Sequence, residues 1–498
     1  MTRAVFGLDV GTSSTKAVLT DLTGGILGWA TREHVVQRPA PGHVEQDPHV
    51  WWAEFRALAH ELLQEHPDVD VRAVGISGMG PCVALTDANG RPVRSAILYG
   101  VDTRAVQEIA EWTERLGGPE AILQRGGSEL STQAAGPKIA WVAKYEPDTY
   151  ARARRLFMPA SWLVYQLTGR YTLDHQSASQ CTPMYDIENR AWYRPWSDAI
   201  APGLELPELA WAGDVAGVIS DEAAALTGLP AGIPVTVGTI DAWSEALSID
   251  GHNPGDLMLM YGTTMFFVNT VTTPVRSPIL WGTVGALPDT RNVAGGMATS
   301  GAITNWLREL YGSPDFATLV AEASAAGPGA HGLLLLPYFA GERTPVMDPA
   351  ARGVLAGLTV DHTRGDVYRA ALEATGFAVR HNVEAIEAAG GQIDRIVAVG
   401  GGTKGDVWTQ IVSDITGREQ VIPSQTIGAS YGMAWLASCI EDPIPANRWN
   451  PPARTLQPNG ATVGLYDALY SDYLALYSAT RDIQHRLADQ QVSSARRH

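Results

Sequence analysis

The sequence has few cysteines, a shortage of basic residues and no long apolar stretch. Only 3 of its 498 residues are cysteine, and Cys82, Cys181 and Cys439 lie too far apart for a disulfide framework or a zinc site. Lys and Arg total 36 against 53 Asp and Glu, for a formal net charge of −17. A general nucleic-acid binder needs a basic face instead. No run approaches the ~18 apolar residues of a membrane span. We therefore expect a cytoplasmic protein without nucleic-acid or membrane partners.

The chain length predicts more than one domain, because 498 residues exceed the size at which one hydrophobic core stops growing. Strand and helix patterns alternate, which indicates an α/β architecture. In the first half we expect a strand hairpin to about residue 21, helices at 51–63, 138–145 and 161–167, and a strand at 71–76. In the second half we expect helices at 302–310 and 364–389 and strands at 333–336 and from 393 into the glycine turn 400–402.

Two stretches of the chain repeat one device, an apolar strand, a tight Gly-Thr turn and a second apolar strand. The first runs from Val5 through Gly11-Thr-Ser-Ser14 to Thr20, and the second from Leu257 through Gly262-Thr-Thr264 to Asn269. Glycine lets the backbone approach an anion, while hydroxyls and free N–H groups supply donors. One such turn usually just joins two strands. Two in one chain predict that ATP is clamped by both.

A polar segment rich in Gly and Pro, Ile249–Asp256, precedes the second hairpin and marks the predicted domain boundary. Two hairpins and two strand-to-glycine turns in matching order indicate a duplicated fold with a nucleotide between its halves. We therefore predict an N-terminal domain over 1–252, a C-terminal domain over 253–445, and a helical extension over 446–498. The helical pattern of the extension spans 466–487, and its last residues, from 492, are expected to form a frayed tail.

Two aspartates follow apolar strands and suit phosphoryl transfer, which depends on positioning and charge neutralisation. Asp9 is a candidate Mg²⁺ ligand, acting through water; the alternative is an Asp that caps the turn. Asp241 closes the stretch that begins at Ile233 and is the candidate general base for a substrate hydroxyl. The alternative for Asp241 is a helix N-cap. In so acidic a protein, ATP also needs a few placed cations, such as Lys16.

At this point the chain resembles a known family. The run Gly353-Val-Leu-Ala-Gly-Leu358, followed by Asp366–Glu373, matches the second signature of the FGGY carbohydrate kinases, which include xylulokinase, glycerol kinase and ribulokinase. Other motifs fall in the order that this family shows, over roughly residues 4–440: Asp9–Lys16, Glu45–Pro48 with Trp51-Trp52, Gly238–Asp241, Tyr261–Thr263, Ser300–Ala302 and Gly400–Gly402. The first family signature, around Lys138, is met only in part, because Ala135 and Tyr145 depart from it.

The resemblance implies a duplicated actin-like (ribonuclease-H-like) ATPase fold of the α/β class, with two domains flanking a central cleft. It places the sugar site and the first phosphate loop in the N-terminal domain and ATP binding in the C-terminal domain. By position it assigns the first phosphate loop to Thr12, Ser13, Ser14 and Lys16, a γ-phosphate contact to Thr263, and further ATP contacts to Gly301, Asn305, Gly402 and Asp406. A Rossmann reading of Val399–Lys404 fails, because the Gly-x-Gly-x-x-Gly spacing is absent.

The acceptor site departs from the xylulokinase pattern. After the strand at 71–76 those enzymes typically show Gln-Met-His-Gly, whereas this chain has Ser77-Gly-Met-Gly-Pro-Cys82, and they have a polar residue where it has Ala242. The Trp-Asn-Asp segment is here Tyr99-Gly-Val-Asp102. Substrate contacts are expected from Met79, Asp102, Arg104, Gln133 and Asp241. Because a buried hydroxyl without a partner costs about 1–3 kcal/mol, the choice among ketopentoses such as xylulose or ribulose and related polyols stays open.

The sequence thus predicts a carbohydrate kinase that uses ATP and Mg²⁺ and acts on a small sugar or polyol. A different class of function uses the same fold, namely an actin-like or chaperone-like ATPase, or an inactive kinase homologue, that works on a protein partner. Asp241 and the family signature favour the kinase, and the altered Gly80-Pro81 and Ala242 leave the rival open. Whether two copies form a homodimer is also left open.

Overall fold

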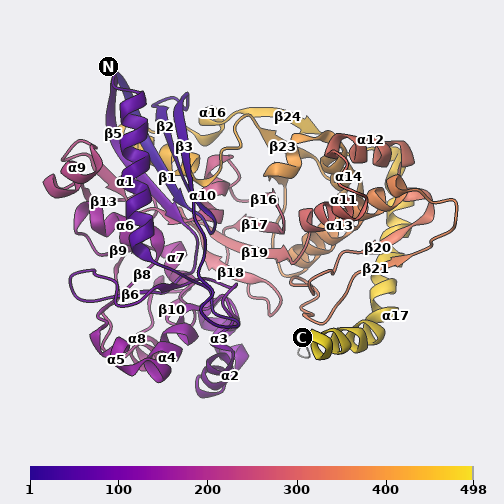
Figure 1. Ribbon diagram of the computed structural model, residues 1–498, viewed down its shortest axis with the longest axis horizontal. Helices are drawn as coiled ribbons and strands as arrows, with labels where there is room; N and C mark the ends of the chain where they lie inside the picture. Colours follow the sequence, from indigo (N-terminus) through magenta and orange to yellow (C-terminus); the bar gives the residue numbers. More distant parts are fainter. Residues whose placement is uncertain (496–498) are drawn as a thin grey trace. The chain divides into compact units, whose positions relative to one another are not determined.

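The computed structural model describes residues 1–495, with side chains through residue 491. It divides into two compact units (Figure 1). Within the described residues, the first contains residues 1–253, 270–292 and 427–451, and the second contains residues 254–269, 293–426 and 452–495. The sequence predicted consecutive domains, whereas these units interleave along the chain.

The first unit is built on a mixed sheet in the order β13-β14-β5-β1-β2-β3, with β15 also pairing with β5. Strand β1 is antiparallel to β2 and parallel to β5, so the opening hairpin is confirmed. The bounds are β1 Thr2–Val10, β2 Ser14–Asp21, β3 Ile26–Glu33, β5 Val69–Gly78, β13 Val215–Val218, β14 Pro234–Thr236 and β15 Thr239–Ile240.

Successive residues of β1 face opposite sides of this sheet, and different helices pack on the two sides. Phe6 and Leu8 belong to an apolar core that also contains Trp51 and Phe55 of α1 (Pro48–Glu65) and residues of α6 (Pro159–Thr168). On the opposite face, Gly7 lies against the backbone of α15 (Ala429–Glu441), which packs on β1, β5 and α10 (Asp241–Ser248). This packing places residues 427–451 with the first unit although they come late in the chain.

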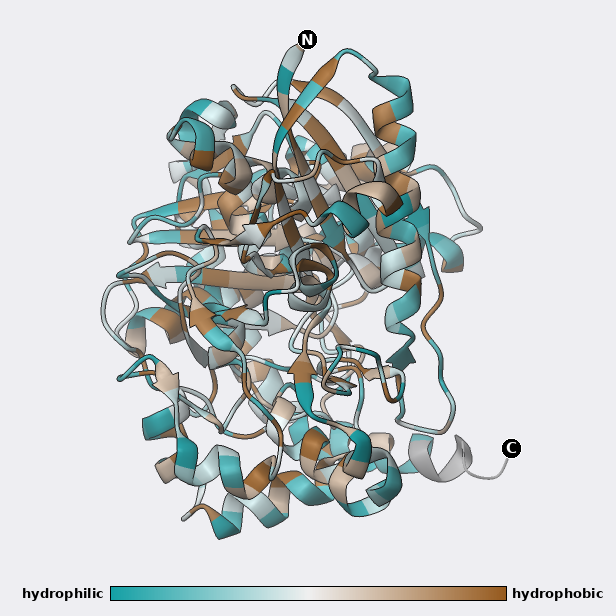
Figure 2. Ribbon diagram, turned by 90° about the vertical axis from the view of Figure 1, so that its left-hand side faces the viewer, coloured by the Kyte–Doolittle hydropathy of each residue, from teal (hydrophilic) through white to brown (hydrophobic). Residues whose placement is uncertain are grey.

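Shorter elements complete the first unit. They are β4 Glu45–Gln46, β6 Ala84–Thr86, β7 Ala96–Ile97, α2 Val106–Arg115, α3 Pro119–Gly126, α4 Ala135–Tyr145, α5 Pro147–Arg152, β8 Arg155–Phe157, β9 Thr172–Asp174, α7 His175–Ser179, β10 Tyr185–Asp186, β11 Ala191–Trp192, α8 Arg194–Ile200, β12 Glu208–Ala210, α9 Asp221–Thr227 and α16 Ala446–Trp449. In Figure 2 the helices at the periphery include many hydrophilic residues, coloured teal, whereas the central strands are largely hydrophobic, coloured brown.

The second sheet has the order β18-β19-β17-β16-β22-β23-β24. Strand β16 is antiparallel to β17 and parallel to β22, so the second predicted hairpin is also confirmed. The bounds are β16 Asp256–Tyr261, β17 Met265–Val271, β18 Trp281–Val284, β19 Arg291–Met297, β22 Arg395–Val399, β23 Gln420–Pro423 and β24 Pro452–Leu456.

The two sheets share one plan. In each, a central strand (β1 or β16) has an antiparallel hairpin partner on one side and a parallel strand (β5 or β22) on the other. The next strand outward is parallel, and the outermost is antiparallel to it. The predicted duplicated α/β fold is confirmed.

Helix α13 (Arg364–Ala388) carries the family signature and is held by its charged residues. Thr363 and Asp366 form a reciprocal capping box at its start. Glu373 accepts hydrogen bonds from Arg369 Nε at 2.7 Å, the Tyr466 hydroxyl at 2.9 Å and the Gly329 amide at 2.9 Å. These buried charges are therefore paired and fix the helix within the second unit.

The remaining elements of the second unit are α11 Gly301–Leu310, α12 Phe316–Ala326, β20 Leu334–Leu336, β21 Val354–Ala356, α14 Asp406–Thr416 and α17 Val463–Ala495. Helix α17 continues through residues 492–495, where the sequence predicted a frayed tail, and 496–498 lie outside the described residues. All three cysteines are free thiols. Among the described helices, none combines the length and apolarity that crossing a membrane requires.

Candidate active site

The first turn, Gly11–Ser14, has donors that no protein group uses. Its ends are closed by the Gly11 amide, which donates to the Ser14 carbonyl at 3.0 Å. Within the described residues, the amides of Thr12 and Ser13 donate to no protein acceptor. The Thr12 hydroxyl shares a hydrogen bond of 2.8 Å with the Tyr99 hydroxyl. The turn therefore offers free N–H groups of the kind that bind a phosphate oxygen.

Asp9 and Asp241 lie at the carboxyl ends of two strands, β1 and β15, that both pair with β5. Asp9 is the second-last residue of β1, and its carboxylate accepts a 2.9 Å hydrogen bond from the hydroxyl of Ser77 on β5. Strand β15 pairs with β5 at Ser77 and Gly78 and leads directly into Asp241. Ligands of open α/β sheets bind at such strand ends.

Both carboxyl groups have a raised pKa. Burial is the main reason that the pKa of Asp9 rises to about 6, against the opposing effects of Ser77 and Lys16. Burial, followed by the charge of Asp9, raises the pKa of Asp241 to about 7. Asp241 is nevertheless partly exposed, and its carboxylate accepts from the neighbouring Ala242 amide at 2.8 Å. Its N-cap alternative does not hold, because Ile240 occupies the N-cap and no side chain caps α10.

Glu245 is a third carboxyl group at this place, one helical turn after Asp241 on α10. It is 8 % exposed, and its carboxyl forms no hydrogen bond or ion pair within the described residues. Burial chiefly raises the pKa of Glu245 to about 8, the charges of Asp9 and Asp241 add to this, and Lys16 opposes it. The carboxyl is thus largely protonated at neutral pH.

The Glu245→Gln variant is expected to be more stable than the wild type at alkaline pH. A raised pKa means that the folded state binds the proton more tightly than the unfolded chain, so this stabilisation is present at low pH and is lost as pH rises through about 8. Thermal unfolding should give similar melting temperatures at pH 5 and a gain of about 2 °C or more for the variant at pH 8.5. Exposed Glu222 on α9 supplies the control Glu222→Gln. A difference independent of pH would contradict this account.

Lys16 lies on β2 directly opposite Asp9 in the strand register and is exposed. It lines a surface hollow of about 680 Å³ together with Ser13, Ser14, Thr31, Glu33, His34 and Val35. Three of the four residues predicted for the first phosphate loop therefore border one hollow. A cation beside free amides suits a phosphate group.

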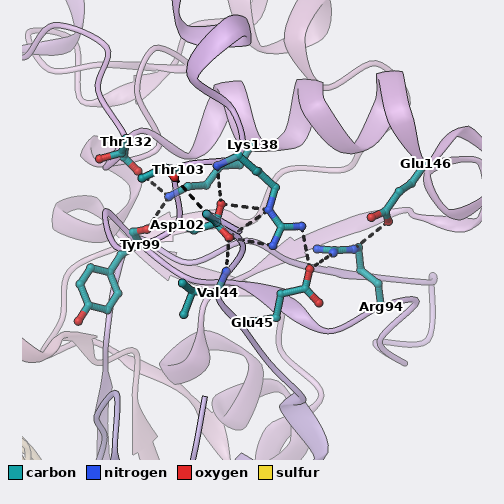
Figure 3. Close-up of polar contacts among 11 residues, drawn as sticks. Val44, Glu45, Arg94, Tyr99, Asp102, Thr103, Thr132, Lys138 and Glu146 are labelled. Carbon is teal, nitrogen blue, oxygen red and sulfur yellow. Dashed lines mark hydrogen bonds and ion pairs between the residues drawn. The ribbon is translucent and has the colours of Figure 1, made fainter. Parts of the chain in front are cut away.

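The predicted sugar contacts Asp102 and Arg104 lie in a buried ionic network (Figure 3). Asp102 accepts from Arg104 Nη2 at 2.8 Å and from the Val44 amide at 2.6 Å. Arg104 also pairs with Glu45 at 2.7 Å, and Arg94 links Glu45 to Glu146. Both side chains already have partners, so the network shapes the loop from Tyr99 to Arg104. Direct contact of either side chain with a sugar stays a prediction.

Three other residues surround this loop. Gln133 is partly exposed, and its side-chain oxygen accepts from the Gly100 amide at 3.0 Å. Lys138 is buried, donates to the carbonyls of Tyr99 at 2.9 Å and Thr132 at 2.6 Å, and has its pKa lowered to about 8 by burial (Figure 3). Met79 is fully buried in the apolar core of the first unit. Gln133 is thus the residue of this group best placed to meet a ligand.

In the second unit, the turn Gly262–Thr264 repeats the first. The Gly262 amide donates to the Thr264 carbonyl at 3.1 Å, and within the described residues the amides of Thr263 and Thr264 have no protein acceptor. The start of α11 supports this turn, because Gly301 donates to Gly262, and Ser300 and Ala302 both donate to the Thr263 carbonyl, each at 3.0 Å. A Cβ at Gly301 would lie 2.7 Å from the Gly262 carbonyl, which explains glycine there.

The second glycine turn adjoins the first one in this unit. A Cβ at Gly402 would lie 2.9 Å from the Tyr261 Cβ and 2.7 Å from the ring of Trp408, so only glycine fits. Asp406, the first residue of α14, is exposed and pairs with Arg454, while Asn305 is exposed on α11. These contacts bring the two turns and the start of α11 together, so Thr263, Gly301 and Gly402 lie close to one another. Contact of Asn305 or Asp406 with ATP stays a prediction.

No group of three or more His, Cys, Asp or Glu side chains among the described residues has the arrangement of a metal site. Mg²⁺ does not require one, since it keeps several waters and binds through one or two carboxylates and substrate phosphates. The charge of Asp9, which raises the pKa of Asp241, is the observation that fits a cation there, because a divalent charge would offset it.

Sequence reasoning did not find Ser77, Tyr99 or Glu245, nor the buried role of Lys138. Ser77 and Tyr99 act through contacts across strands and loops that only the fold brings together. A signal existed for Glu245, because it lies four residues after Asp241 and so on the same helical face. For Lys138, the signal was a lysine among apolar residues of α4.

Comparison with known proteins gives a consistent picture. Residues 4–248 match the N-terminal domain, and residues 257–440 the C-terminal domain, of the FGGY family of carbohydrate kinases. The chain is 29% identical to the xylulose kinase of Escherichia coli K12 over 445 residues, covering 88% of this chain and 90% of that protein. It is 32% identical to the glycerol kinase of Nocardia farcinica over 458 residues, covering 86% and 89%. The crystal structure of xylulose kinase from Rhodospirillum rubrum superposes with a TM-score of 0.90 at 31% identity, covering 97% of this chain and 100% of that one.

Proposed function

Because the chain belongs to the FGGY family of carbohydrate kinases, we propose that it transfers the γ-phosphate of Mg-ATP to a hydroxyl of a ketopentose, such as xylulose or ribulose, or of a related polyol. Asp241 is the general base in this proposal. The observation that carries it is the partly exposed Asp241 carboxylate beside Asp9, with its pKa raised to about 7. A base with such a pKa is half ionised near neutral pH and can accept the hydroxyl proton.

The other predicted residues would contact different parts of the nucleotide. The free amides of Thr12, Ser13 and Thr263, with Ser14 and Lys16, suit the phosphate oxygens, and Gly301, Asn305, Gly402 and Asp406 suit the rest of the nucleotide. Asp9 would hold Mg²⁺ through water, and the bound cation would neutralise phosphate charge. Gln133 would orient the acceptor, and Asp102 and Arg104 would shape its loop.

Two features support a sugar or polyol of modest polarity at the acceptor position. The segment after β5, Met79–Cys82, supplies no charged or amide side chain. Ala242 offers no side-chain donor beside the base. Fewer protein donors favour a small acceptor with few hydroxyls to satisfy.

A panel of ketopentoses, pentitols, tetritols and glycerol, assayed for ADP release with and without each compound, tests the proposal. Glycerol belongs in the panel because one relative is named a glycerol kinase. ADP release that depends on one acceptor supports the kinase, and mass spectrometry of the product would identify the phosphorylated compound. ATP hydrolysis that no compound changes would contradict it and would favour the ATPase alternative.

A further inference from the structure

His34 lies directly behind the first phosphate loop and contacts it twice. It follows the last residue of β3, and its backbone amide donates to the Ser13 carbonyl at 3.0 Å. Its imidazole Nε2 lies 3.0 Å from the Gly11 carbonyl oxygen. The imidazole side chain is 5% exposed. One residue therefore holds both the first and the third residue of the turn Gly11–Ser14.

The second ring nitrogen of His34 is also engaged. Nδ1 lies 2.9 Å from a carboxylate oxygen of Glu54 on α1. The same carboxylate accepts a 2.5 Å hydrogen bond from the hydroxyl of Thr15, the residue that follows the turn. Glu54 thus connects the ring of His34 to the first residues of β2.

The two groups that face the ring nitrogens of His34 are both hydrogen-bond acceptors. A backbone carbonyl and an ionised carboxylate only accept, and a neutral imidazole can donate from only one nitrogen. Both short contacts are satisfied together when both ring nitrogens carry protons, which makes His34 an imidazolium. The hydrogen bonds and charge of Glu54, with the carbonyls of the turn, outweigh burial and raise the pKa of His34 above its ordinary value.

Other charged groups lie beside the ring or line the hollow that it borders. Lys16 and Glu33 line the same surface hollow as His34, and Glu54 faces the ring from α1. Of these groups, Glu54 favours the positive charge of the ring. Ser13 and Ser14 border the hollow as well, so the imidazolium lies next to the groups assigned to phosphate.

We propose that His34, as an imidazolium held between Glu54 and the Gly11 carbonyl, is a positioning residue that keeps the first phosphate loop in its phosphate-binding form. It fixes the carbonyls of the loop on the inner side, which leaves the amides of Thr12 and Ser13 free for an anion. Its positive charge adds to the local attraction for phosphate in an acidic protein. This inference rests on the proposed role of the loop in nucleotide binding.

The test measures the dissociation constant for Mg-ADP by calorimetry at several pH values between 6 and 9, for the wild type, His34→Gln and Glu54→Gln. His34→Gln should weaken binding about 10-fold at pH 6, and the wild type should approach the variant as pH rises and the ring loses its proton. The titration of the ring, followed by the NMR signal that His34→Gln removes, should have a midpoint above 6.5, which Glu54→Gln should lower.

His49→Gln is the matched control, since His49 is exposed on α1 and lies outside the loop. Equal affinity of the wild type and His34→Gln at pH 6, or a ring midpoint at or below 6.5, would overturn the inference. If His34→Gln unfolds, the ring signal whose midpoint moves in Glu54→Gln identifies His34, and its midpoint in the wild type still decides. Absence of Mg-ADP binding by the wild type would instead refute the proposed nucleotide site.

Discussion

Asp241→Asn is expected to lower kcat for sugar phosphorylation by about 10³-fold while changing the dissociation constant for Mg-ADP less than about threefold. The variant keeps the shape of the side chain but removes the group that accepts the hydroxyl proton, and general-base catalysis contributes about 10²–10⁴-fold. Nucleotide binding should survive because the groups proposed to bind phosphate are backbone amides and Lys16, not Asp241. Steady-state kinetics and calorimetry would measure the two effects separately.

The pH profile gives a second test of the same residue. Because the pKa of Asp241 is raised to about 7, its carboxyl is protonated and inactive as a base below that pH. The kcat of the wild type should therefore rise between about pH 6 and 8, and the residual activity of Asp241→Asn should lose this rise. Asp221→Asn is the control, because Asp221 is likewise the first residue of a helix, α9, but is exposed elsewhere. Equal losses of turnover and of nucleotide binding in Asp241→Asn would indicate a structural residue.

Gly7→Ala is expected to destabilise the first unit by about 3 kcal/mol or more. A Cβ at Gly7 would lie 2.1 Å from the Ser430 carbonyl oxygen and 2.7 Å from the Ala434 amide nitrogen. Both are backbone atoms of α15, so neither can rotate away, and relief requires moving the helix off β1. Thermal unfolding should show a melting temperature lower by about 6 °C or more.

Gly213→Ala provides the comparison within the same unit. A Cβ there would meet only a Leu436 methyl group at 3.5 Å, an ordinary contact with the same helix. Its melting temperature should stay within about 2 °C of the wild type. A similar small change for Gly7→Ala would show that α15 can shift at little cost, contrary to the packing described above.

Local patterns were sufficient for much of the fold. The two hairpins follow from apolar strands that flank Gly-Thr turns, and β5 and β22 from apolar runs that end in glycine. Helix α13 follows from the periodicity of residues 364–388. The order of these elements then gives the duplication, because each half repeats the same sequence of local signals.

Long-range packing was not visible in the sequence. The docking of α15 on β1 and β5 depends on the absent side chains of Gly7 and Gly75, which a pattern search does not connect with residues about 430. Asp102 and Arg104 were expected to face a sugar, but the sequence could not show that Glu45 and Val44 would already occupy them. The burial of a side chain and its partners depend on the folded unit as a whole. Asp9 and Asp241 could be proposed from their place after apolar strands, whereas the role of Asp102 and Arg104 depends on partners from distant parts of the chain.

The polypeptide passes from one compact unit to the other at residues 253–254, 269–270, 292–293, 426–427 and 451–452. Two of these passages fall inside strands β17 and β19. A gene split once near its middle would therefore not encode two self-sufficient halves, because the upstream product would lack the helix that covers its own sheet. A protease that cuts one passage would likewise give two fragments held together only by non-covalent packing, because at least one unit would have residues in both fragments.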